Sequence, residues 1–425
     1  MIRVFKFGGA LLNDAKGIER MVSIVEEFKC EPLIVVVSAI GKTTNTLENL
    51  LSLAIHKDEK LAAEYFSLKS FHINLIQSLP FVNHNKLINE VENLFRNLWD
   101  VLNQPFDNYF TGYDEIVSFG EKISGKIMAA RLSAKKLIVA ELPAEKIIAT
   151  NSNHTDASVN WQQTEKNITA HLFPLLHDGK IVITQGFIGS DNDGNITTLG
   201  REGSDYTAAI IGSILNANEI VIWKDVPGLM NADPKLFKDA VKLNNISYHE
   251  AIELTFYGAS VIHPKTIQPL QKKGLTLQVR SFWEPHAAPS LISENRSEDD
   301  KIPKIIAKPN QTLLSFSSRN MDFIEEANLF HIFKALSRYK IHINLMQNSA
   351  VSFSVCFDQN QKKQKALISE LSNMFFIKYN SGLTLLTFRY YNNEILKQFT
   401  DKKKVLLVQK NRTTAQFLGF FDLFT

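Results

Sequence analysis

A lysine followed by two glycines lies close to the start of the chain, in the run Lys6-Phe7-Gly8-Gly9. Paired glycines let a backbone come close to a ligand, so that its N–H groups can face phosphate oxygens. Lys6 would add a compact positive charge beside them. A Gly-Gly turn after a strand also occurs without any ligand, so the motif alone leaves both interpretations open.

A second segment, from Thr197 to Asp205, is rich in glycine and hydroxyl groups and runs into a predicted helix. A helix N-terminus attracts anions through its free N–H groups and its dipole. Arg201 has the shape to bind a carboxylate through two hydrogen bonds. Ser204 is the expected N-cap, with Asp205 in the first turn. Asp205 then either stabilises the helix dipole or positions a lysine and the substrate.

Charged residues also gather after the predicted strand that ends at Trp223. Lys224 and Asp225 follow this strand directly, and Asp233 and Lys235 come shortly afterwards. In open α/β sheets, ligands bind at the carboxyl ends of the strands. These residues are therefore candidates for ligand contacts, and solvated loop charges are the alternative.

Two other glycine-lysine segments fail as phosphate-binding loops of the Walker type. The first, Gly41-Lys42-Thr43, would need a glycine where Val36 stands. The second, Gly120 to Lys126, is followed by Ile127, where a serine or threonine must hold magnesium. No G-x-G-x-x-G motif follows a predicted strand, so a nicotinamide enzyme is unsupported.

An α/β domain must position these candidate residues. Short β-branched runs alternate with longer helical segments over the first two thirds of the chain, which predicts a mainly parallel sheet flanked by helices. The segment from 44 to about 108 has no strand signal and is predicted to be a helical insertion. The predicted strands are Ile2–Phe7, Leu33–Ser38, Ile181–Gln185, Glu219–Trp223 and Leu275–Val279.

We expect a domain at 1–285, a linker at 286–304 and a C-terminal region at 305–425. A helix late in the first domain should start at the capping box Ser247-Tyr248-His249-Glu250 and end at Pro264. The linker is polar, charged and proline-bearing. After it, the signals follow the βαββαβ order of an α+β ferredoxin-like unit, with a shorter partner behind it.

Composition limits the classes of partner. The 425 residues suggest two or three domains, and the formal charge of +3 is too small for nucleic acid or a polybasic membrane contact. Two cysteines without metal-ligand spacing argue against a disulfide framework or a zinc site. No signal-peptide core or long apolar stretch is present, so we expect a cytoplasmic protein whose partners are small molecules or other subunits.

Eight segments, taken in order, resemble the aspartate kinases of the amino-acid-kinase family, over essentially the whole chain. They are KFGGA, VVSAIGKTTNTL, SFGEKIS, TQGFIG, TTLGREGSDYTAA, IWKDVPGLMNADPK, ISYHEAIEL and GASVIHPKT. One segment would be weak, but eight in register are specific. The resemblance implies transfer of the γ-phosphoryl group of MgATP to the β-carboxylate of L-aspartate. That reaction gives 4-phospho-L-aspartate, the first step of lysine, threonine and methionine biosynthesis.

The resemblance also implies roles for individual residues. Lys6 would neutralise charge on the transferring phosphoryl group, and Asp205 would organise that lysine. Glu121 would suit the ammonium group of the substrate, and Arg201 its carboxylate. Magnesium would be held chiefly by ATP oxygens and water, with no protein ligand. The further substrate-binding positions implied are Ser38, Thr44, Gly203 and Ser204. The nucleotide-binding positions implied are Lys6, Phe7, Gly8, Gly9, Lys224, Asp225, Met230, Lys235 and Ser260.

Four positions depart from the pattern of the family, and the first is Ala10, which replaces a threonine after the first glycines. Ser260 stands where many relatives place a lysine near the nucleotide, so Lys265 or Lys224 would supply that charge, or the site has less of it. Glu202 replaces a glycine beside the anion site, which is unfavourable unless its side chain points outward. Met230 stands where a tyrosine often stacks on the nucleotide.

The segment from about 305 to 424 resembles paired ACT domains, which bind amino acids and build dimer interfaces. In relatives inhibited by an end product, the effector contacts fall around Asn344, Asn348 and Ser349. Asn344 stands where aspartate is common, so a site for the ammonium of lysine has lost charge. Lysine is the expected effector, and a structural tail that forms a homodimer or a higher assembly is the alternative.

Two other functions remain open at this point. Another kinase of the same fold, such as an acetylglutamate, glutamate or uridylate kinase, would usually lack the helical insertion and the ACT-like tail. A catalytically silent amino-acid sensor is the second alternative. Ser260 and Glu202 favour it, whereas intact Lys6 and Asp205 argue against it.

Overall fold

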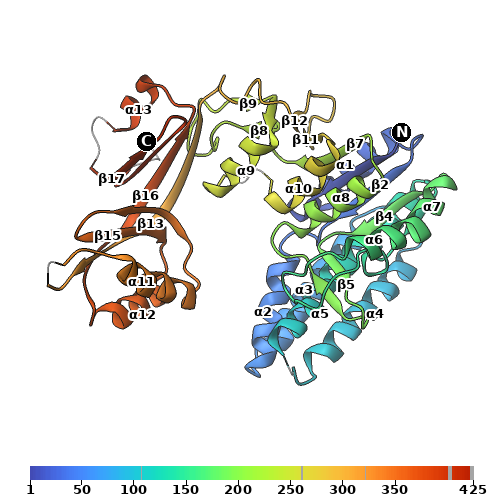
Figure 1. The fold of residues 1–425 in the computed structure, drawn as a ribbon. Helices are drawn as coiled ribbons and strands as arrows, with labels where there is room; N and C mark the ends of the chain where they lie inside the picture. Colours follow the sequence, from blue (N-terminus) through green and yellow to red (C-terminus); the bar gives the residue numbers. More distant parts are fainter. Residues whose placement is uncertain (107, 260–261, 321, 401–403, 422–425) are drawn as a thin grey trace. The chain divides into compact units, whose positions relative to one another are not determined.

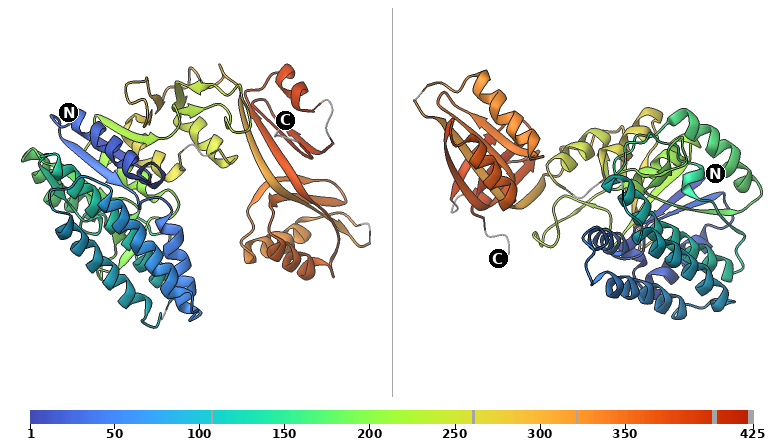
Figure 2. Two further views of the ribbon diagram at one scale, coloured as in Figure 1. Left: turned by 180° about the vertical axis from the view of Figure 1, so that it is seen from behind. Right: turned by 90° about the horizontal axis from the view of Figure 1, so that it is seen from below.

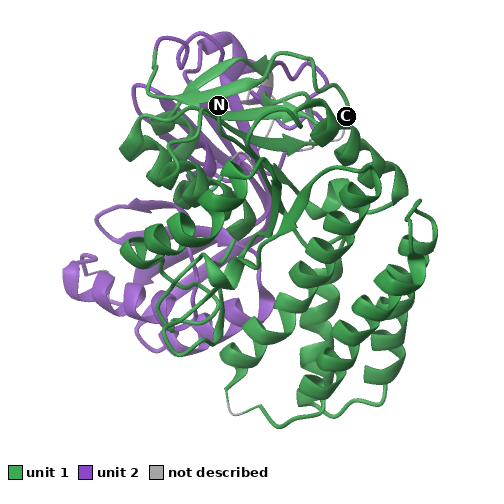
Figure 3. Ribbon diagram, turned by 90° about the vertical axis from the view of Figure 1, so that its right-hand side faces the viewer, with its two compact units in different colours: residues 1–229, 242–252, 261–296 green, residues 230–241, 253–260, 297–425 purple. Residues whose placement is uncertain are grey.

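The chain forms two compact units in the computed structural model, which describes residues 1–106, 108–259, 262–320, 322–400 and 404–421 (Figures 1 and 3). Unit 1 consists of residues 1–229, 242–252 and 261–296. Unit 2 consists of residues 230–241, 253–260 and 297–425. Each unit is built around one sheet.

The sheet of unit 1 has eight strands. All neighbouring strands are parallel except β11 and β12, which confirms the mainly parallel α/β fold. β1 lies in the middle of the sheet, so that Lys6 is paired with Val36 of β2 and Ile222 of β7. In order across the sheet, the strands are β10 (Asn245–Ser247), β12 (Ser290–Ser293), β11 (Leu277–Ser281), β7 (Glu219–Lys224), β1 (Arg3–Phe7), β2 (Leu33–Val37), β4 (Ile181–Gln185) and β3 (Val139–Glu141).

The five predicted strands are all confirmed, with ends that shift by two residues or fewer. Their runs of β-branched residues suit the buried centre of a parallel sheet. All five residues of β2 are buried, as are all five of β4. β1 lies between β7 and β2, so these two strands hold Lys6 and the segment after it from both sides.

Four consecutive helices cover the region from 43 to 134, and three of them fall in the segment that had no strand signal. They lie side by side as a bundle (Figures 1 and 2). α2 packs on α5, and α4 packs on both α3 and α5. α5 also packs on β2 and β4, so it connects the bundle to the sheet. The helices are α2 (Thr43–Ile55), α3 (Leu61–Gln77), α4 (His84–Leu102) and α5 (Tyr109–Ala134).

Further helices flank the sheet of unit 1. α8 packs on β1, β2 and β7, and α10 packs on α8. Arg131 of α5 donates two hydrogen bonds to Glu19 of α1, at 2.5 and 2.7 Å. The remaining elements are η1 (Gly9–Leu12), α1 (Ala15–Glu27), η2 (Ala144–Lys146), α6 (Trp161–Asn167), η3 (Ile168–Leu172), α7 (Phe173–His177), β5 (Ile188–Ser190), β6 (Ile196–Thr198), α8 (Gly203–Ile214), β8 (Leu229–Met230), β9 (Lys242–Leu243), α9 (Tyr248–Phe256) and α10 (Pro264–Lys273).

Two predictions about the end of the α/β region are wrong. The capping box does start α9, because Glu250 N donates to Ser247 Oγ at 3.0 Å. The helix stops at Phe256, however, and Pro264 instead begins α10, where a missing N–H costs nothing. The predicted linker contains β12, which pairs with β10 and β11 and therefore belongs to the sheet.

Unit 2 contains a six-stranded antiparallel sheet. Its first part has the predicted order βαββαβ, and its strands lie in the order β14, β15, β13, β16. α11 and α12 cover one face of this part (Figure 2). β16 also pairs with β18, so the later strands extend the same sheet. The elements are β13 (Lys304–Ser318), α11 (Glu326–Arg338), β14 (Ile343–Asn348), β15 (Ser352–Asp358), α12 (Gln361–Leu371), β16 (Phe375–Arg389), α13 (Asn393–Thr400), β17 (Val405–Lys410) and β18 (Thr414–Gly419).

Candidate active site

A cavity of about 480 Å³ opens in unit 1 near the ends of β1 and β2 and the start of α8. It brings together all eight residues predicted for catalysis and substrate binding: Lys6, Ser38, Thr44, Glu121, Arg201, Gly203, Ser204 and Asp205. Five further residues line it and were not predicted: Tyr113, Thr155, Phe187, Gly200 and Glu202. The motifs are scattered along the chain, and the fold gathers them at one place.

Lys6 and Asp205 form an ion pair inside this cavity. Lys6 Nζ lies 2.7 Å from Asp205 Oδ1, and both side chains are largely buried, with 13% and 5% exposed. Lys6 comes from the central strand β1, whereas Asp205 lies in the first turn of α8. A positive charge is thereby held beside the start of a helix, which itself favours anions.

The two glycines after β1 differ in what surrounds them. Gly8 has ordinary extended dihedral angles, and a side chain there would make normal contact with Lys6 Nζ at 3.4 Å. A Cβ on Gly9 would instead collide with the carbonyl oxygen of Ala39. Gly9 O also accepts a hydrogen bond from Gly41 N at 2.9 Å. Gly9 therefore lets the turns after β1 and β2 pack against each other.

Phe7 contributes only its backbone to this region. Its side chain is fully buried and stacks on Trp223, with ring centroids 5.9 Å apart. Phe7 O accepts a hydrogen bond from Ser38 N at 3.2 Å. The predicted nucleotide contact of Phe7 therefore cannot involve its ring.

Glu121 projects from α5 and is almost completely buried, with 2% exposed. Burial raises the pKa of this carboxyl group to about 8, although a hydrogen bond from the Ala39 backbone and the charge of Lys6 oppose the shift. Glu121 Oε2 has no hydrogen-bond partner among the described residues. A buried acceptor without a partner is costly, so this oxygen is suited to a ligand that brings a donor.

The start of α8 differs from the prediction, because Ser204 is not its N-cap. The helix begins at Gly203, and the cap is Glu202, in a left-handed conformation with φ of 55°. Glu202 Oε2 accepts a hydrogen bond from His263 N at 3.0 Å. This contact stabilises a backbone conformation that is unfavourable for a residue with a side chain. It also engages the negative charge that looked unfavourable beside an anion site.

Arg201 lies in the turn between β6 and α8. Its side chain is exposed and makes no hydrogen bond or ion pair with any other residue that the structure describes. Gly200 precedes it with φ of +79°, and a Cβ there would collide with Asp156 Oδ1. The turn therefore presents an uncommitted guanidinium group to the cavity.

Tyr113 closes another side of the cavity and was missed by the sequence analysis. Its hydroxyl group donates to Glu48 Oε1 at 2.7 Å. Burial and the contact with Glu48 raise the pKa of Tyr113, so it stays protonated. Tyr113 lies two helical turns before Glu121 on α5, and Glu48 lies one turn after Thr44 on α2. Helical spacing from the two predicted residues was the signal that could have found it.

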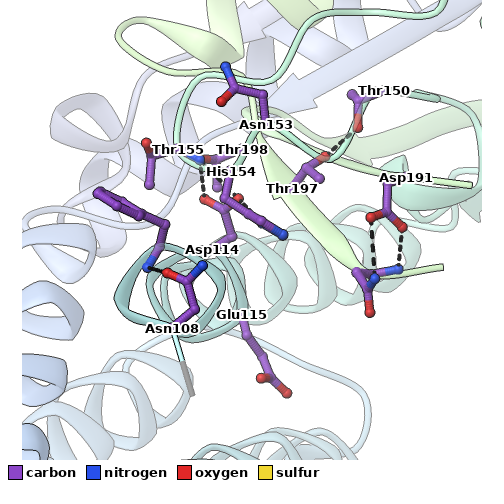
Figure 4. A network of polar contacts seen from close by, with 12 residues as sticks. Asn108, Asp114, Glu115, Thr150, Asn153, His154, Thr155, Asp191, Thr197 and Thr198 are labelled. Atoms are coloured by element: carbon purple, nitrogen blue, oxygen red, sulfur yellow. Dashed lines mark hydrogen bonds and ion pairs between the residues drawn. The ribbon is translucent and has the colours of Figure 1, made fainter. Parts of the chain in front are cut away.

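Thr155 reaches the cavity from the loop between η2 and α6 and was also missed. Figure 4 shows this loop beside β6 and α5, with Asp114 between them. Thr155 N donates to both carboxylate oxygens of Asp114, at 3.1 and 3.0 Å. The loop is thereby attached to the helix that carries Glu121.

The residues predicted to bind the nucleotide are not all in this cavity. Lys6 lines it, and Lys224 and Asp225 lie at the end of β7 in unit 1. Met230 and Lys235 belong to unit 2. Ser260 lies outside the described residues.

Lys265, one of the two lysines considered as a substitute for the charge missing at Ser260, is engaged elsewhere. Its Nζ forms an ion pair with Asp156 and lies 3.4 Å from Leu199 O. Lys265 therefore supports the Arg201 side of the cavity.

The predicted effector residues lie on β14 and just after it in unit 2. Asn344 Nδ2 donates to Gln311 Oε1 at 2.7 Å and to Asp358 Oδ1 at 3.0 Å. Asn344 Oδ1 accepts from Lys308 Nζ at 2.8 Å. Asn348 and Ser349 are exposed at the far end of the strand. An ammonium group of the protein itself thus occupies the place beside Asn344.

Comparison with known proteins identifies the family. The model of the amino acid kinase family matches residues 1–281. Lysine-sensitive aspartokinase 3 of Escherichia coli (strain K12) is 31% identical over 396 residues, which cover 91% of this chain and 86% of that protein. The chain belongs to the aspartokinases. Aspartokinase 1, chloroplastic, of Arabidopsis thaliana is 30% identical over 379 residues, which cover 86% of this chain and 65% of that protein.

Solved aspartokinase structures share this architecture. E. coli aspartokinase III in complex with lysine and aspartate (T-state) superposes with a TM-score of 0.83 at 27% identity, covering 98% of this chain and 95% of that chain. The same enzyme in complex with aspartate and ADP (R-state) gives a TM-score of 0.80 at 26% identity, covering 99% and 96%. The resemblance to aspartate kinases is therefore confirmed.

In the described part of the chain, no group of three or more His, Cys, Asp or Glu side chains is arranged to hold a metal ion. None of the described helices is long and apolar enough to cross a membrane.

Proposed function

We propose that this chain is an aspartate kinase, which transfers the γ-phosphoryl group of MgATP to the β-carboxylate of L-aspartate. The products are ADP and 4-phospho-L-aspartate. This reaction is the first step towards lysine, threonine and methionine. The related E. coli enzyme has been solved with aspartate and with ADP, which supports both substrates.

One observation carries the choice of substrate: the cavity offers an unpaired carboxylate oxygen and an uncommitted guanidinium group. Glu121 Oε2 has no hydrogen-bond partner among the described residues, and Arg201 makes no ion pair with any of them. An amino acid brings an ammonium group to the first and a carboxylate to the second. Both contacts are charge-assisted hydrogen bonds, which are about twice as strong as neutral ones.

The phosphoryl transfer then needs little covalent help from the protein. The β-carboxylate of aspartate is already ionised at neutral pH, so no strong general base is required. Lys6 would neutralise charge on the transferring group, with Asp205 holding its ammonium in place. The N–H groups after β1 and at the start of α8 add further donors for anions. Catalysis becomes alignment together with charge neutralisation.

We assign the nucleotide to the region around Lys6, Gly8 and Gly9, with Lys224 and Asp225 at the end of the neighbouring strand. Nucleotide contacts at Met230, Lys235 and Ser260 remain predictions from the sequence. Magnesium suits ATP oxygens and water as ligands, and when bound it would neutralise phosphate charge. Lys6 would neutralise phosphate charge together with the bound magnesium.

Regulation by lysine through unit 2 is the second part of the proposal. Relatives include an enzyme described as lysine-sensitive and solved in complex with lysine. Asn344, Asn348 and Ser349 are the proposed effector contacts, and the ACT-like sheet is the proposed site of homodimer formation. A titration of activity with lysine, threonine and methionine tests this part, and a flat response to all three would remove it.

The activity is tested with purified protein, MgATP and a panel of amino acids, with hydroxylamine to trap acyl phosphate. We expect turnover with aspartate and none with glutamate or acetylglutamate. Arg201→Lys is a sharp companion variant, because it keeps the charge but cannot bind a carboxylate through a planar fork. Turnover only with a glutamate derivative would contradict the proposed substrate. So would the absence of turnover with every amino acid of the panel.

A further inference from the structure

Asp114 is a buried carboxylate beside the active site that has no part in the mechanism above. It lies on α5 with no exposed surface. Its two oxygens accept hydrogen bonds from Thr155 N at 3.0 and 3.1 Å, from Thr198 Oγ1 at 2.5 Å and from His154 Nδ1 at 2.8 Å (Figure 4). All three partners come from outside α5. A carboxylate buried this deeply is retained only where such bonds compensate its desolvation.

Asp114 holds two segments, the loop that carries Thr155 and the end of β6 at Thr198. Both form the wall of the cavity around Arg201. Thr155 lines the cavity directly. Thr198 ends β6, just before the turn that carries Arg201. The two segments also bind each other, because Ala157 N donates to Thr198 O at 2.8 Å. The position of the turn that carries Arg201 therefore depends on the position of Asp114.

Close packing transmits this position to the turn. Gly200 fits only because it lacks a side chain, since a Cβ would collide with Asp156 Oδ1. Asp156 is fixed in turn by its ion pair with Lys265. A shift of the loop around Thr155 would therefore move the backbone next to Arg201.

The same helix carries the residue that receives the ammonium group. Glu121 lies two helical turns after Asp114 on α5. A rigid helix thus bears both Glu121 and the anchor of the Arg201 turn. We propose that Asp114 is a positioning residue, which holds the guanidinium group of Arg201 in register with Glu121 so that one amino acid reaches both. This inference rests on the proposed function, in which Arg201 and Glu121 bind the carboxylate and the ammonium group of aspartate.

A purely structural role would have a different signature. Asp191 closes a nearby turn in a similar way, with bonds from Asp193 N at 3.0 Å and Asn195 N at 2.8 Å, but it does not line the cavity. Asp191→Asn is therefore the matched control for Asp114→Asn. Both exchanges keep one acceptor oxygen and replace the other carboxylate oxygen with an amide nitrogen, which donates and cannot accept a hydrogen bond. Only the Asp114 exchange should disturb Arg201.

The test compares ligands that contain different parts of aspartate. Succinate keeps both carboxylates and lacks the ammonium group, whereas 3-aminopropanoate lacks the α-carboxylate. In Asp114→Asn we expect KM for aspartate and the inhibition constant of succinate to rise at least about tenfold, as for a lost charged hydrogen bond. The inhibition constant of 3-aminopropanoate and KM for ATP should stay within about threefold, as for positions outside the affected contact. Asp191→Asn should change neither KM, for aspartate or for ATP, nor the inhibition constants of succinate and 3-aminopropanoate.

Two outcomes would overturn the inference: equal weakening of all three ligands, or unchanged aspartate and succinate constants in a folded variant. If Asp114→Asn does not fold, Thr198→Val removes one of the three partners of Asp114. It should also raise KM for aspartate and the inhibition constant of succinate. Unchanged constants in that variant would then count against the inference. Absence of aspartate turnover in the wild-type protein would refute the proposed function separately, because the binding constants can still be measured by calorimetry.

Discussion

Lys6 Nζ lies 2.7 Å from Asp205 Oδ1 in a cavity that also holds Glu121 and Arg201. The two residues are far apart in sequence and meet because α8 packs on β1. Parallel strands bring their carboxyl ends to one edge of a sheet, and the helix that follows β6 starts there. The pair therefore joins the central strand to the helix terminus at which anions are expected.

Replacement of Lys6 should affect the chemical step most strongly. We expect Lys6→Ala to lower kcat at least about a hundredfold, because one preorganised charge is removed from the transition state. The variant also leaves Asp205 buried without its partner, so its melting temperature should be measured in parallel. Lys29→Ala, at an exposed position after α1, is the control and should keep normal activity. A near-normal kcat in folded Lys6→Ala would refute the role assigned to Lys6.

The two glycines after β1 allow a comparison of almost identical changes. Gly9→Ala places a Cβ against the carbonyl oxygen of Ala39, whose backbone N–H also binds Glu121. We expect a loss of about a hundredfold or more in kcat/KM, because the donors after β1 and the carboxylate of Glu121 would move together. Gly8→Ala meets only Lys6 Nζ at 3.4 Å and keeps an allowed backbone conformation. It should stay within about tenfold of the wild type. Equal losses in the two variants would contradict this explanation, and steady-state kinetics on both proteins provides the measurement.

Strand positions could be predicted where the local pattern and the tertiary environment agree. β2 and β4 are continuous β-branched runs, and they are buried on both faces. β12 could not be found in this way, because Ser290–Ser293 lies in a polar, proline-bearing stretch. Its pairing with β10 and β11 defines it as a strand, and pairing between distant segments leaves little local signal.

Prediction of the candidate site also succeeded where the sequence carried a local signal and failed where contacts between distant segments decide the structure. The ordered motifs placed eight residues, and the fold brings all eight to one cavity. The start of α8 was misassigned because side-chain preference favours Ser204 as a cap, whereas a backbone contact from His263 stabilises Glu202 in the left-handed conformation. Asp114 was missed because its partners are distant in sequence. Its spacing of two helical turns from Glu121 was the available local signal.

The raised pKa of Glu121 predicts a pH dependence for aspartate binding. Below about pH 8 the buried carboxyl group is mostly protonated and cannot pair with an ammonium group. KM for aspartate should therefore fall as the pH rises from about 6 to 8, by up to about tenfold per pH unit, and then level off. The measurement is KM for aspartate at saturating MgATP across this range.

Glu121→Gln separates this effect from other titrations. The amide keeps the size of the side chain but does not ionise, so aspartate should bind more weakly and its KM should lose the steep dependence below about pH 8. KM for ATP in the wild type is a second control and should not follow the same curve. A wild-type KM for aspartate that stays flat between about pH 6 and 8 would show that Glu121 does not titrate in this range, against the prediction.

The contact between Lys308 and Asn344 allows a test of the proposed lysine site. Lys308 Nζ donates to Asn344 Oδ1 at 2.8 Å and lies 3.1 Å from Asp358 Oδ1. An effector ammonium group at this place must displace that of Lys308. We therefore expect Lys308→Ala to lower the lysine concentration for half-maximal inhibition about tenfold, since the freed acceptors are worth one charged hydrogen bond. Lys378→Ala, at an exposed position of the same sheet, should leave the inhibition curve unchanged. Threonine and methionine lack a side-chain ammonium group, so their curves should not move in either variant. If Lys308→Ala instead abolishes inhibition by lysine, Lys308 supports the effector site, and its ammonium group does not compete with the effector.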